Sequence, residues 1–192
     1  MLRSVEQLVR RFFVDVANPD ETFYNEASLQ HELALFLRRE LPKDWRLHIE
    51  RPAWWFRGAA KALTKKEIDL AVADGAREQV VAIELKCPRQ GQHPEQMFKA
   101  CQDLQFLEQL VAAGFSGGLF AMHVQDPLFY EGGSQVGIYA HFRGGMPICG
   151  TIQKPTGARD MSASIRGSYT PVWTPSQGSH RYWVQTVLPP TA

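Results

Sequence analysis

Three segments of the chain carry apolar residues at the spacing of an amphipathic helix. Residues 2–16 place them three and four positions apart, so that they share one face. Residues 25–41 repeat this pattern behind Asn25, a residue type that commonly caps helix N-termini, and Pro42 follows them. Residues 94–113 repeat it again. The sequence therefore predicts three helices at these positions.

A β-hairpin is predicted where the apolar pattern changes from helical to alternating. Residues 68–72 and 80–85 lie on either side of Asp74-Gly75, a dipeptide typical of tight turns. We also predict strands from aromatic content, alternation or continuous apolar character at residues 46–50, 54–56, 118–124, 136–142 and 182–187.

The order of these elements predicts an α/β fold in which helices flank a central mixed β-sheet. A chain of 192 residues with 44% hydrophobic residues fits a single domain with one core. Residues 126–192 are rich in Gly, Pro and Ser, and we expect them to form a β-rich C-terminal extension of that domain and not a second domain.

Charge and cysteine content limit the possible partners and location. The net charge of +1 excludes the strongly basic profile of a protein that coats nucleic acid, but it allows a local basic patch. Cys87, Cys101 and Cys149 show no C-x-x-C spacing, so we expect free thiols and no zinc site. Charged residues interrupt the N-terminal apolar positions, so we expect no signal peptide, no membrane partner and a cytoplasmic location.

Acidic and basic residues interrupt the two hairpin strands on one face. Side chains alternate along a strand, so Ala82, Glu84 and Lys86 are expected on one face, opposite Ile83 and Leu85. On the preceding strand, we expect Asp69, Ala71 and Ala73 on one face and Ile68, Leu70 and Val72 on the other. The turn could then bring Asp69 beside Glu84.

Buried charges at these positions need compensation, because removing a charge from water costs several kcal/mol. A divalent metal ion is one such compensation. Carboxylate and carbonyl oxygens suit Mg²⁺ or Mn²⁺, so Asp69, Glu84 and the Leu85 carbonyl could hold one ion. Lys86 could then orient a nucleophilic water, or deprotonate it if the ion lowered the pKa of the lysine.

Ile68-Asp69 on the first strand and Glu84-Leu85-Lys86 on the second resemble the D…(D/E)-x-K motif of the PD-(D/E)XK, or restriction-endonuclease-like, nucleases. The family's proline before the aspartate is replaced by Ile68. The resemblance covers about residues 25–125 and implies a restriction-endonuclease-like core. It implies that Asp69 and Glu84 bind the metal, that Lys86 serves the water, and that the protein cuts phosphodiester bonds, most simply in DNA.

The same resemblance implies a polar contribution from the helix before the hairpin. In the family, an acid there commonly stands three and seven residues before apolar positions. Glu26 satisfies this rule with Leu29 and Leu33, and Gln30 fits it with Leu33 and Leu37, whereas Glu32 lies on the flank of the apolar stripe. We therefore expect Glu26 and Gln30 at the site. The helix after the motif offers the further candidates Gln96, Lys99, Gln102 and Asp103.

Other interpretations of these residues remain open. Glu84 and Lys86 could form an ordinary ion pair in an unrelated α/β protein, and Glu26 could simply stabilise the first turn of its helix. The fold could also be a catalytically inactive module that binds nucleic acid or a protein. Substrates other than DNA are possible, and double-strand cleavage would favour a homodimer.

Two further patterns attract attention. Residues 114–118 match G-x-S-x-G, but a helix precedes them and a strand follows, so we expect a loop and not a nucleophile elbow. An aromatic and basic segment precedes the first hairpin strand and could contact nucleic acid or be structural. Its members are Arg51, Trp54, Trp55, Arg57, Lys61, Lys65 and Lys66.

Overall fold

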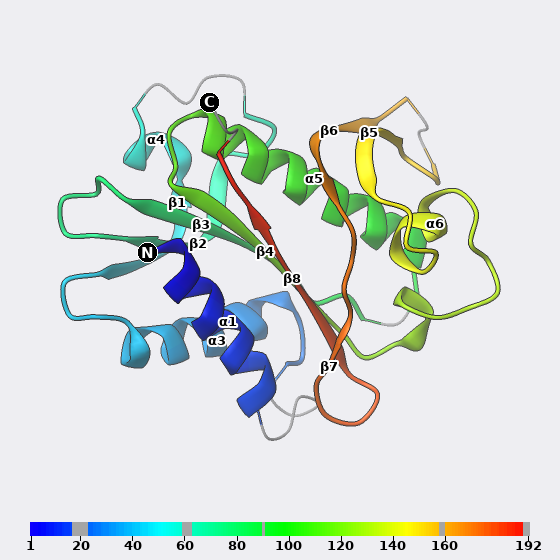
Figure 1. The fold of residues 1–192 in the computed structure, drawn as a ribbon, viewed down its shortest axis with the longest axis horizontal. Helices are drawn as coiled ribbons and strands as arrows, with labels where there is room; N and C mark the ends of the chain where they lie inside the picture. Colours follow the sequence, from blue (N-terminus) through cyan, green and yellow to red (C-terminus); the bar gives the residue numbers. More distant parts are fainter. Residues whose placement is uncertain (17–22, 59–62, 90, 158–159, 190–192) are drawn as a thin grey trace.

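A six-stranded sheet with the order β1–β2–β3–β4–β8–β7 runs through the molecule in this computed structural model (Figure 1). The structure describes residues 1–16, 23–58, 63–89, 91–157 and 160–189. The strands of the sheet are β1 (Arg46–Pro52), β2 (Glu67–Ala73), β3 (Val80–Lys86), β4 (Gly117–Val124), β7 (Thr174–Pro175) and β8 (Arg181–Val187).

The sheet is mixed because helix α5 (His93–Ala112) carries the chain from the end of β3 back to the start of β4. These two strands are parallel, whereas the other neighbouring pairs are antiparallel. The predicted α/β fold with a central mixed sheet flanked by helices is thus confirmed. The predicted hairpin is also confirmed, since β2 pairs with β3 from Ala73–Val80 to Leu70–Ile83.

Helices cover both faces of the sheet (Figure 1). α1 (Leu2–Asp15) and α3 (Glu26–Glu40) pack on one face, in an apolar cluster with Leu70 and other strand residues. α5 packs on the other face, in a second cluster with Ala71. Alternate strand positions therefore enter separate cores, as expected for a sheet buried on both sides.

Helix α3 begins at the predicted cap. The Asn25 side chain accepts a hydrogen bond from the Ser28 N–H at 2.9 Å, and the Ser28 hydroxyl accepts one from the Asn25 N–H at 2.8 Å. This reciprocal capping box satisfies two N–H groups that the helix itself cannot. It fixes the start of α3, where Glu26 is the first helical residue.

We expect Asn25→Ala to lower the free energy of unfolding by about 1 kcal/mol, because it removes the oxygen that accepts from Ser28. Asn25→Gly is the matched control and should cost only a few tenths of a kcal/mol, since glycine leaves the N-terminal N–H groups open to water. Urea denaturation measures both losses. A loss from the alanine variant no larger than that from glycine would show that the side-chain cap contributes nothing.

Two predicted strands are short helices instead. Residues 54–56 belong to α4 (Ala53–Phe56), whose turn is closed by a hydrogen bond from the Arg57 N–H. Most of the predicted strand 136–142 forms α6 (Ile138–Phe142). These predictions were wrong because segments of about five residues are too short for the spacing of apolar residues to separate a helical turn from a strand.

The C-terminal extension is partly built into the central sheet. β8, predicted as a strand at residues 182–187, pairs with β4 over its whole length. Residues 25–125 alone would therefore leave one edge of β4 unpaired, because its neighbour β8 belongs to the extension. The remainder includes η1 (Pro127–Phe129), α6 and a second sheet of β5 (Ile148–Gln153) and β6 (Ser162–Tyr169).

Glu108 of α5 attaches the small β5–β6 sheet to the main body. Its carboxylate accepts hydrogen bonds from the Arg166 N–H at 2.9 Å, the Gly167 N–H at 2.7 Å and the Tyr169 hydroxyl at 2.8 Å. A Cβ at residue 167 would lie within 2.6 Å of the Tyr169 ring. Gly167 is therefore needed for the close approach of β6 to this carboxylate.

Across the described residues, no helix is long and apolar enough to cross a membrane.

Candidate active site

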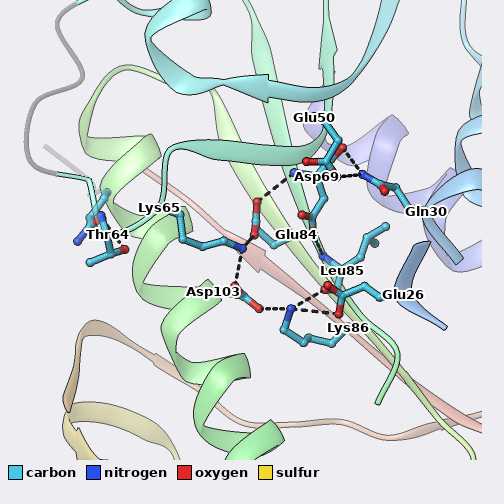
Figure 2. Close-up of polar contacts among 11 residues, drawn as sticks. Glu26, Gln30, Glu50, Thr64, Lys65, Asp69, Glu84, Leu85, Lys86 and Asp103 are labelled. Carbon is cyan, nitrogen blue, oxygen red and sulfur yellow. Dashed lines mark hydrogen bonds and ion pairs between the residues drawn. The ribbon is translucent and has the colours of Figure 1, made fainter. Parts of the chain in front are cut away.

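The two strands of the hairpin separate at Asp69. Backbone pairing between β2 and β3 ends at Leu70 and Ile83. Beyond that point, Asp69 Oδ2 accepts from the Leu85 N–H at 2.7 Å, and Glu84 Oε1 accepts from the Asp69 N–H at 3.3 Å. Each carboxylate is thus held by the backbone of the opposite strand. Figure 2 shows the two side chains next to each other at this position.

The neighbouring strand β1 is also irregular beside Asp69. Glu50 has a φ of 50°, in the left-handed region that non-glycine residues seldom adopt. Gln30 of α3 donates from Nε2 to the Asp69 carbonyl at 2.8 Å and to Glu50 Oε1 at 2.7 Å. Gln30 therefore lies next to Asp69, and it holds the backbone of that residue and not its carboxylate.

Ile68 departs from the expected alternation. We predicted it on the face of Leu70 and Val72, but its side chain packs in the cluster beneath α5 together with Ala71. Leu70 and Val72 lie in the opposite cluster, as expected. The prediction for Ile68 was wrong because β2 is no longer paired with β3 at this end, so the regular pleat does not continue.

Glu84 is fully buried and is paired with a lysine from outside the predicted motif. The Lys65 ammonium contacts Glu84 Oε2 and lies 2.9 Å from Asp103 Oδ1 of α5 (Figure 2). Lys65 comes from the chain just before β2. The structure therefore adds Lys65 to the site, and it places Asp103, one of the four candidates on the helix after the motif, there as well.

Lys86 lies on the face of β3 that carries Glu84, as expected. Its Nζ is 2.9 Å from Asp103 Oδ2 and 3.2 Å from Glu26 Oε2, and it donates to the Leu85 carbonyl at 3.0 Å. Of the two helix acids considered, Glu26 thus contacts the network. Within the described residues, no hydrogen bond or ion pair connects Glu32 to it.

Opposite charges alternate through the whole arrangement. Glu84, Lys65, Asp103, Lys86 and Glu26 follow one another as acid, base, acid, base and acid. Asp103 is the centre of this charge network, because each of its oxygens contacts a different lysine. The ion pair between Asp103 and Lys86 is largely buried and therefore screened little by solvent, so it fixes the positions of these two side chains.

The surroundings of Asp69 and Glu84 raise the pKa of both carboxyl groups. Burial raises the pKa of Asp69 to about 6, although the nearby Lys65 ammonium and the Leu85 N–H oppose the shift. Burial, with Asp69 and Asp103 as neighbouring negative charges, raises the pKa of Glu84 well above its usual range. In both groups the effect of burial on the pKa is larger than the opposing effect of the nearby Lys65 ammonium.

In the two lysines, unlike the two carboxyl groups, the neighbouring charges outweigh the effect of burial on the pKa. Burial alone would lower the pKa of Lys86, but the Asp103 and Glu26 carboxylates outweigh it and raise the pKa above its ordinary value. The pKa of Lys65 is also raised, because Glu84 and Asp103 outweigh its burial. A role for Lys86 as a deprotonated base, considered from the sequence, is therefore opposed by its surroundings.

Sequence reasoning recovered part of this site. Asp103 was one of four candidates on α5, and the distinguishing signal was its place on the buried stripe, three residues after Ala100 and four before Leu107. Lys65 was assigned only to the basic segment, and Glu50 was missed. Among the described contacts, Gln96, Lys99 and Gln102 make none with the carboxylates of the site.

Open space borders the charge network on two sides. A cavity of about 480 Å³ adjoins Lys86 and Glu26 and is also lined by Arg89 and Lys99. A second cavity, of about 350 Å³, adjoins Asp69 and is lined by Glu26 as well. A ligand can therefore reach Lys86 from one cavity and Asp69 from the other.

Three residues of the aromatic and basic segment, Arg51, Trp55 and Arg57, make contacts within the fold. Two guanidinium groups lie close to the Trp55 ring, that of Arg51 at 5.2 Å and that of Arg77 at 4.5 Å from the ring centre. Arg57 donates to carbonyls of neighbouring loops, including that of Gly114 at 2.9 Å. Trp54 is 62% exposed. Lys61 lies outside the described residues.

The G-x-S-x-G segment joins α5 to β4, as predicted for a loop. Ser116 accepts a hydrogen bond from the Val80 N–H at 3.2 Å, and the Ser116 N–H donates to the Val80 carbonyl at 2.8 Å. The serine thus extends the pairing of β3 and is not presented on a sharp turn. No feature of a nucleophile elbow is found in this described segment.

The described part of the chain contains no group of three or more His, Cys, Asp or Glu residues arranged to hold a metal ion. The metal ligands expected from the sequence include only two such residues, Asp69 and Glu84. The third expected ligand is the backbone carbonyl of Leu85, so this site would not form a group of that kind.

A comparison of the chain with protein-family models, curated proteins and solved structures found no match in any of the three.

Proposed function

We propose that this protein is a Mg²⁺- or Mn²⁺-dependent nuclease that hydrolyses phosphodiester bonds in DNA. The observation that carries the proposal is the placement of Asp69 and Glu84. Their carboxylates are held side by side where β2 and β3 separate, with Lys86 on the same strand face. In phosphodiester hydrolysis, two neighbouring acids can bind a metal ion and a nearby lysine can supply a positive charge.

We also propose that α3, β1 to β4 and α5 form a restriction-endonuclease-like core. The order of a helix, a hairpin, a helix and a strand supports this proposal, because it is the order expected around the motif. The contact of Glu26 with Lys86 supports it further. It places an acid from the preceding helix next to the lysine of the motif.

The chemistry of Asp69, Glu84 and the Leu85 carbonyl fits a small divalent cation. All three offer hard oxygen atoms, and Mg²⁺ sites in proteins commonly use one or two carboxylates and retain several waters. Burial keeps the pKa of both carboxyl groups raised even with the Lys65 ammonium nearby, so a divalent ion would add compensating positive charge. When bound, the ion would supply an activated water and relief of negative charge on the phosphate.

Lys86 would act as a charged, oriented group. Asp103 and Glu26 hold its ammonium from two directions and keep it protonated. A fixed positive charge stabilises the negative charge that develops on a phosphate during hydrolysis, and it can orient the attacking water. Gln30 would contribute indirectly, by holding the Asp69 backbone.

DNA is the substrate that we favour, and the cavity beside Lys86 supports a phosphate-bearing ligand. Arg89 and Lys99 line this cavity together with Lys86, and such side chains bind nucleic-acid backbones. One site per chain cuts one strand at a time, so cleavage of both strands would be favoured by a homodimer.

A module of the same fold that binds nucleic acid or a protein without cutting is the second candidate. The contact of the Lys65 ammonium with Glu84 favours it, because this lysine already neutralises part of the acidic pair. The two candidates differ in their response to divalent ions. Only the nuclease requires an ion at Asp69 and Glu84.

The first experiment is therefore Mg²⁺ and Mn²⁺ binding by calorimetry, combined with a plasmid-nicking assay. We expect wild type to bind the ion and nick the plasmid, and Asp69→Ala to do neither, because the variant loses a metal ligand. Asp44→Ala, which removes an exposed acid at the turn before β1, should behave like wild type. Absence of both binding and nicking in wild type would reject the nuclease.

A further inference from the structure

Lys65 contacts a proposed metal ligand, yet the proposed mechanism gives it no role. Its ammonium touches Glu84 Oε2, and the other oxygen of that carboxylate accepts from the Asp69 N–H. Both oxygens of Glu84 are thus occupied in this structure. Lys86 also contacts a proposed ligand, the Leu85 carbonyl, but its acidic partners are Asp103 and Glu26 and it contacts neither carboxylate ligand, Asp69 or Glu84.

The attachment of Lys65 to the fold leaves its side chain able to move. The preceding residue, Thr64, is anchored to α5, since its N–H and hydroxyl both donate to Gln109 Oε1, at 2.8 and 3.0 Å. The side chain of Lys65 itself is 35% exposed, whereas that of Glu84 is fully buried. Lys65 therefore reaches the carboxylate from the solvent side.

A cavity adjoins the same side chain. It has a volume of about 600 Å³ and is lined by Lys65, Lys66 and Trp54 among others. A lysine side chain that released Glu84 could enter this space without repacking the core. Asp103 would keep its second partner, because Lys86 contacts the other oxygen of that carboxylate.

We propose that Lys65 is a built-in competitor for the divalent ion: its ammonium occupies the Glu84 side of the metal site and must move into the adjacent cavity before the ion binds. This inference rests on the proposed function and concerns the regulation of that site. An ammonium and a divalent cation compete for Glu84 Oε2, because two positive charges a few ångströms apart repel strongly in a buried site.

The contact of Lys65 with Glu84 therefore has opposite effects on the stability of the metal-free protein and on its affinity for the metal. Without the ion, Lys65 compensates Glu84 and Asp103 and so stabilises the folded chain. With the ion, the same contact must be broken, so it weakens metal binding. Removal of the ammonium should therefore destabilise the metal-free protein and strengthen its binding of Mn²⁺.

The first test compares wild type, Lys65→Met and Lys66→Met by Mn²⁺ calorimetry and by thermal unfolding with and without Mn²⁺. Methionine keeps an unbranched side chain and removes the charge, and Lys66 is an exposed neighbour in the same segment. We expect Lys65→Met to bind Mn²⁺ on the order of tenfold more tightly, within the usual range for two coupled ligands. Its melting temperature should be lower without Mn²⁺ and rise more on adding it, whereas Lys66→Met should match wild type.

The outcomes separate this inference from the proposed nuclease. Equal or weaker Mn²⁺ binding by Lys65→Met, with clear binding by wild type, would overturn the role of Lys65 and leave the nuclease intact. Binding by Lys65→Met alone would support the role of Lys65 and favour the module that does not cut. Binding by neither protein would overturn both proposals.

A second test needs no variant. Metal-free and Mn²⁺-saturated wild type are treated briefly with an amine-reactive reagent, and the modification of Lys65 and Lys66 is measured by peptide mass spectrometry. We expect Mn²⁺ to increase the modification of Lys65 several-fold, because its ammonium leaves the carboxylates, and to leave Lys66 unchanged. Modification of Lys65 that does not respond to saturating Mn²⁺ would show that the lysine stays in place, against the proposal.

Discussion

Lys86→Ala should abolish plasmid nicking while the protein remains folded and still binds Mn²⁺. Lys86 contacts neither carboxylate ligand, Asp69 or Glu84, and the Leu85 carbonyl to which it donates belongs to the backbone of β3, so its removal leaves the proposed ligands in place. The variant loses the one positive charge that Asp103 and Glu26 hold next to the site. Loss of such a preorganised charge slows the chemical step by roughly a hundredfold or more. Single-turnover nicking rates and calorimetry measure the two effects separately.

The matched controls test whether charge or packing is responsible. Lys86→Met retains most of the side-chain stem and should be as inactive as Lys86→Ala, because only the ammonium is needed. Lys43→Ala removes an exposed lysine between α3 and β1 and should nick like wild type. Wild-type nicking by Lys86→Met would contradict the mechanism, since it would show that the charge plays no part.

Asp103→Ala should cause the largest loss of stability among single substitutions in the charge network. The Asp103 side chain is 4% exposed, and it separates the ammonium groups of Lys65 and Lys86. Its removal would leave two positive charges near each other, with Lys86 deprived of its closest acid. Breaking a buried ion pair on one side typically costs about 3–5 kcal/mol. Chemical denaturation of the metal-free protein measures the change in unfolding free energy.

Two further variants serve as comparisons for the loss of stability in Asp103→Ala. Asp103→Asn keeps the shape and some hydrogen bonding, so we expect it to lie between wild type and Asp103→Ala. Gln102→Ala changes the adjacent, half-buried position of α5 and should alter stability only slightly. If Asp103→Ala were as stable as wild type, the two lysines would not depend on this carboxylate, and the network would have to be discarded.

The part of the site that the sequence predicted is the part encoded locally. Glu84 and Lys86 are two residues apart on one strand, so alternation alone puts them on one face. Asp69 follows from the short hairpin, and Asn25 marks the start of α3 through its own side chain. The central mixed sheet could be predicted for the same reason, since its helices and longer strands have clear spacing.

The remaining part depends on contacts between distant segments. Lys65 reaches Glu84 and Asp103 from a segment with no regular pattern, and such a contact leaves no signature in the sequence. Glu50 lies beside Asp69 only because β1 pairs with β2 and takes an unusual φ there. The pairing of β8 with β4 is of the same kind, because strand order follows from packing and not from spacing along the chain.

The place of β8 also affects how the chain folds. β4 is completely buried and has β3 on one side, but its other edge is covered only by Arg181–Val187, which follows it after a long intervening stretch. Until those residues are synthesised and dock, an apolar strand presents unpaired N–H and C=O groups to other molecules. Such late, long-range pairing is slow, and the unfinished sheet is exposed to aggregation meanwhile. The stretch of chain between β4 and β8 thus sets an interval during which a nascent or truncated chain is vulnerable.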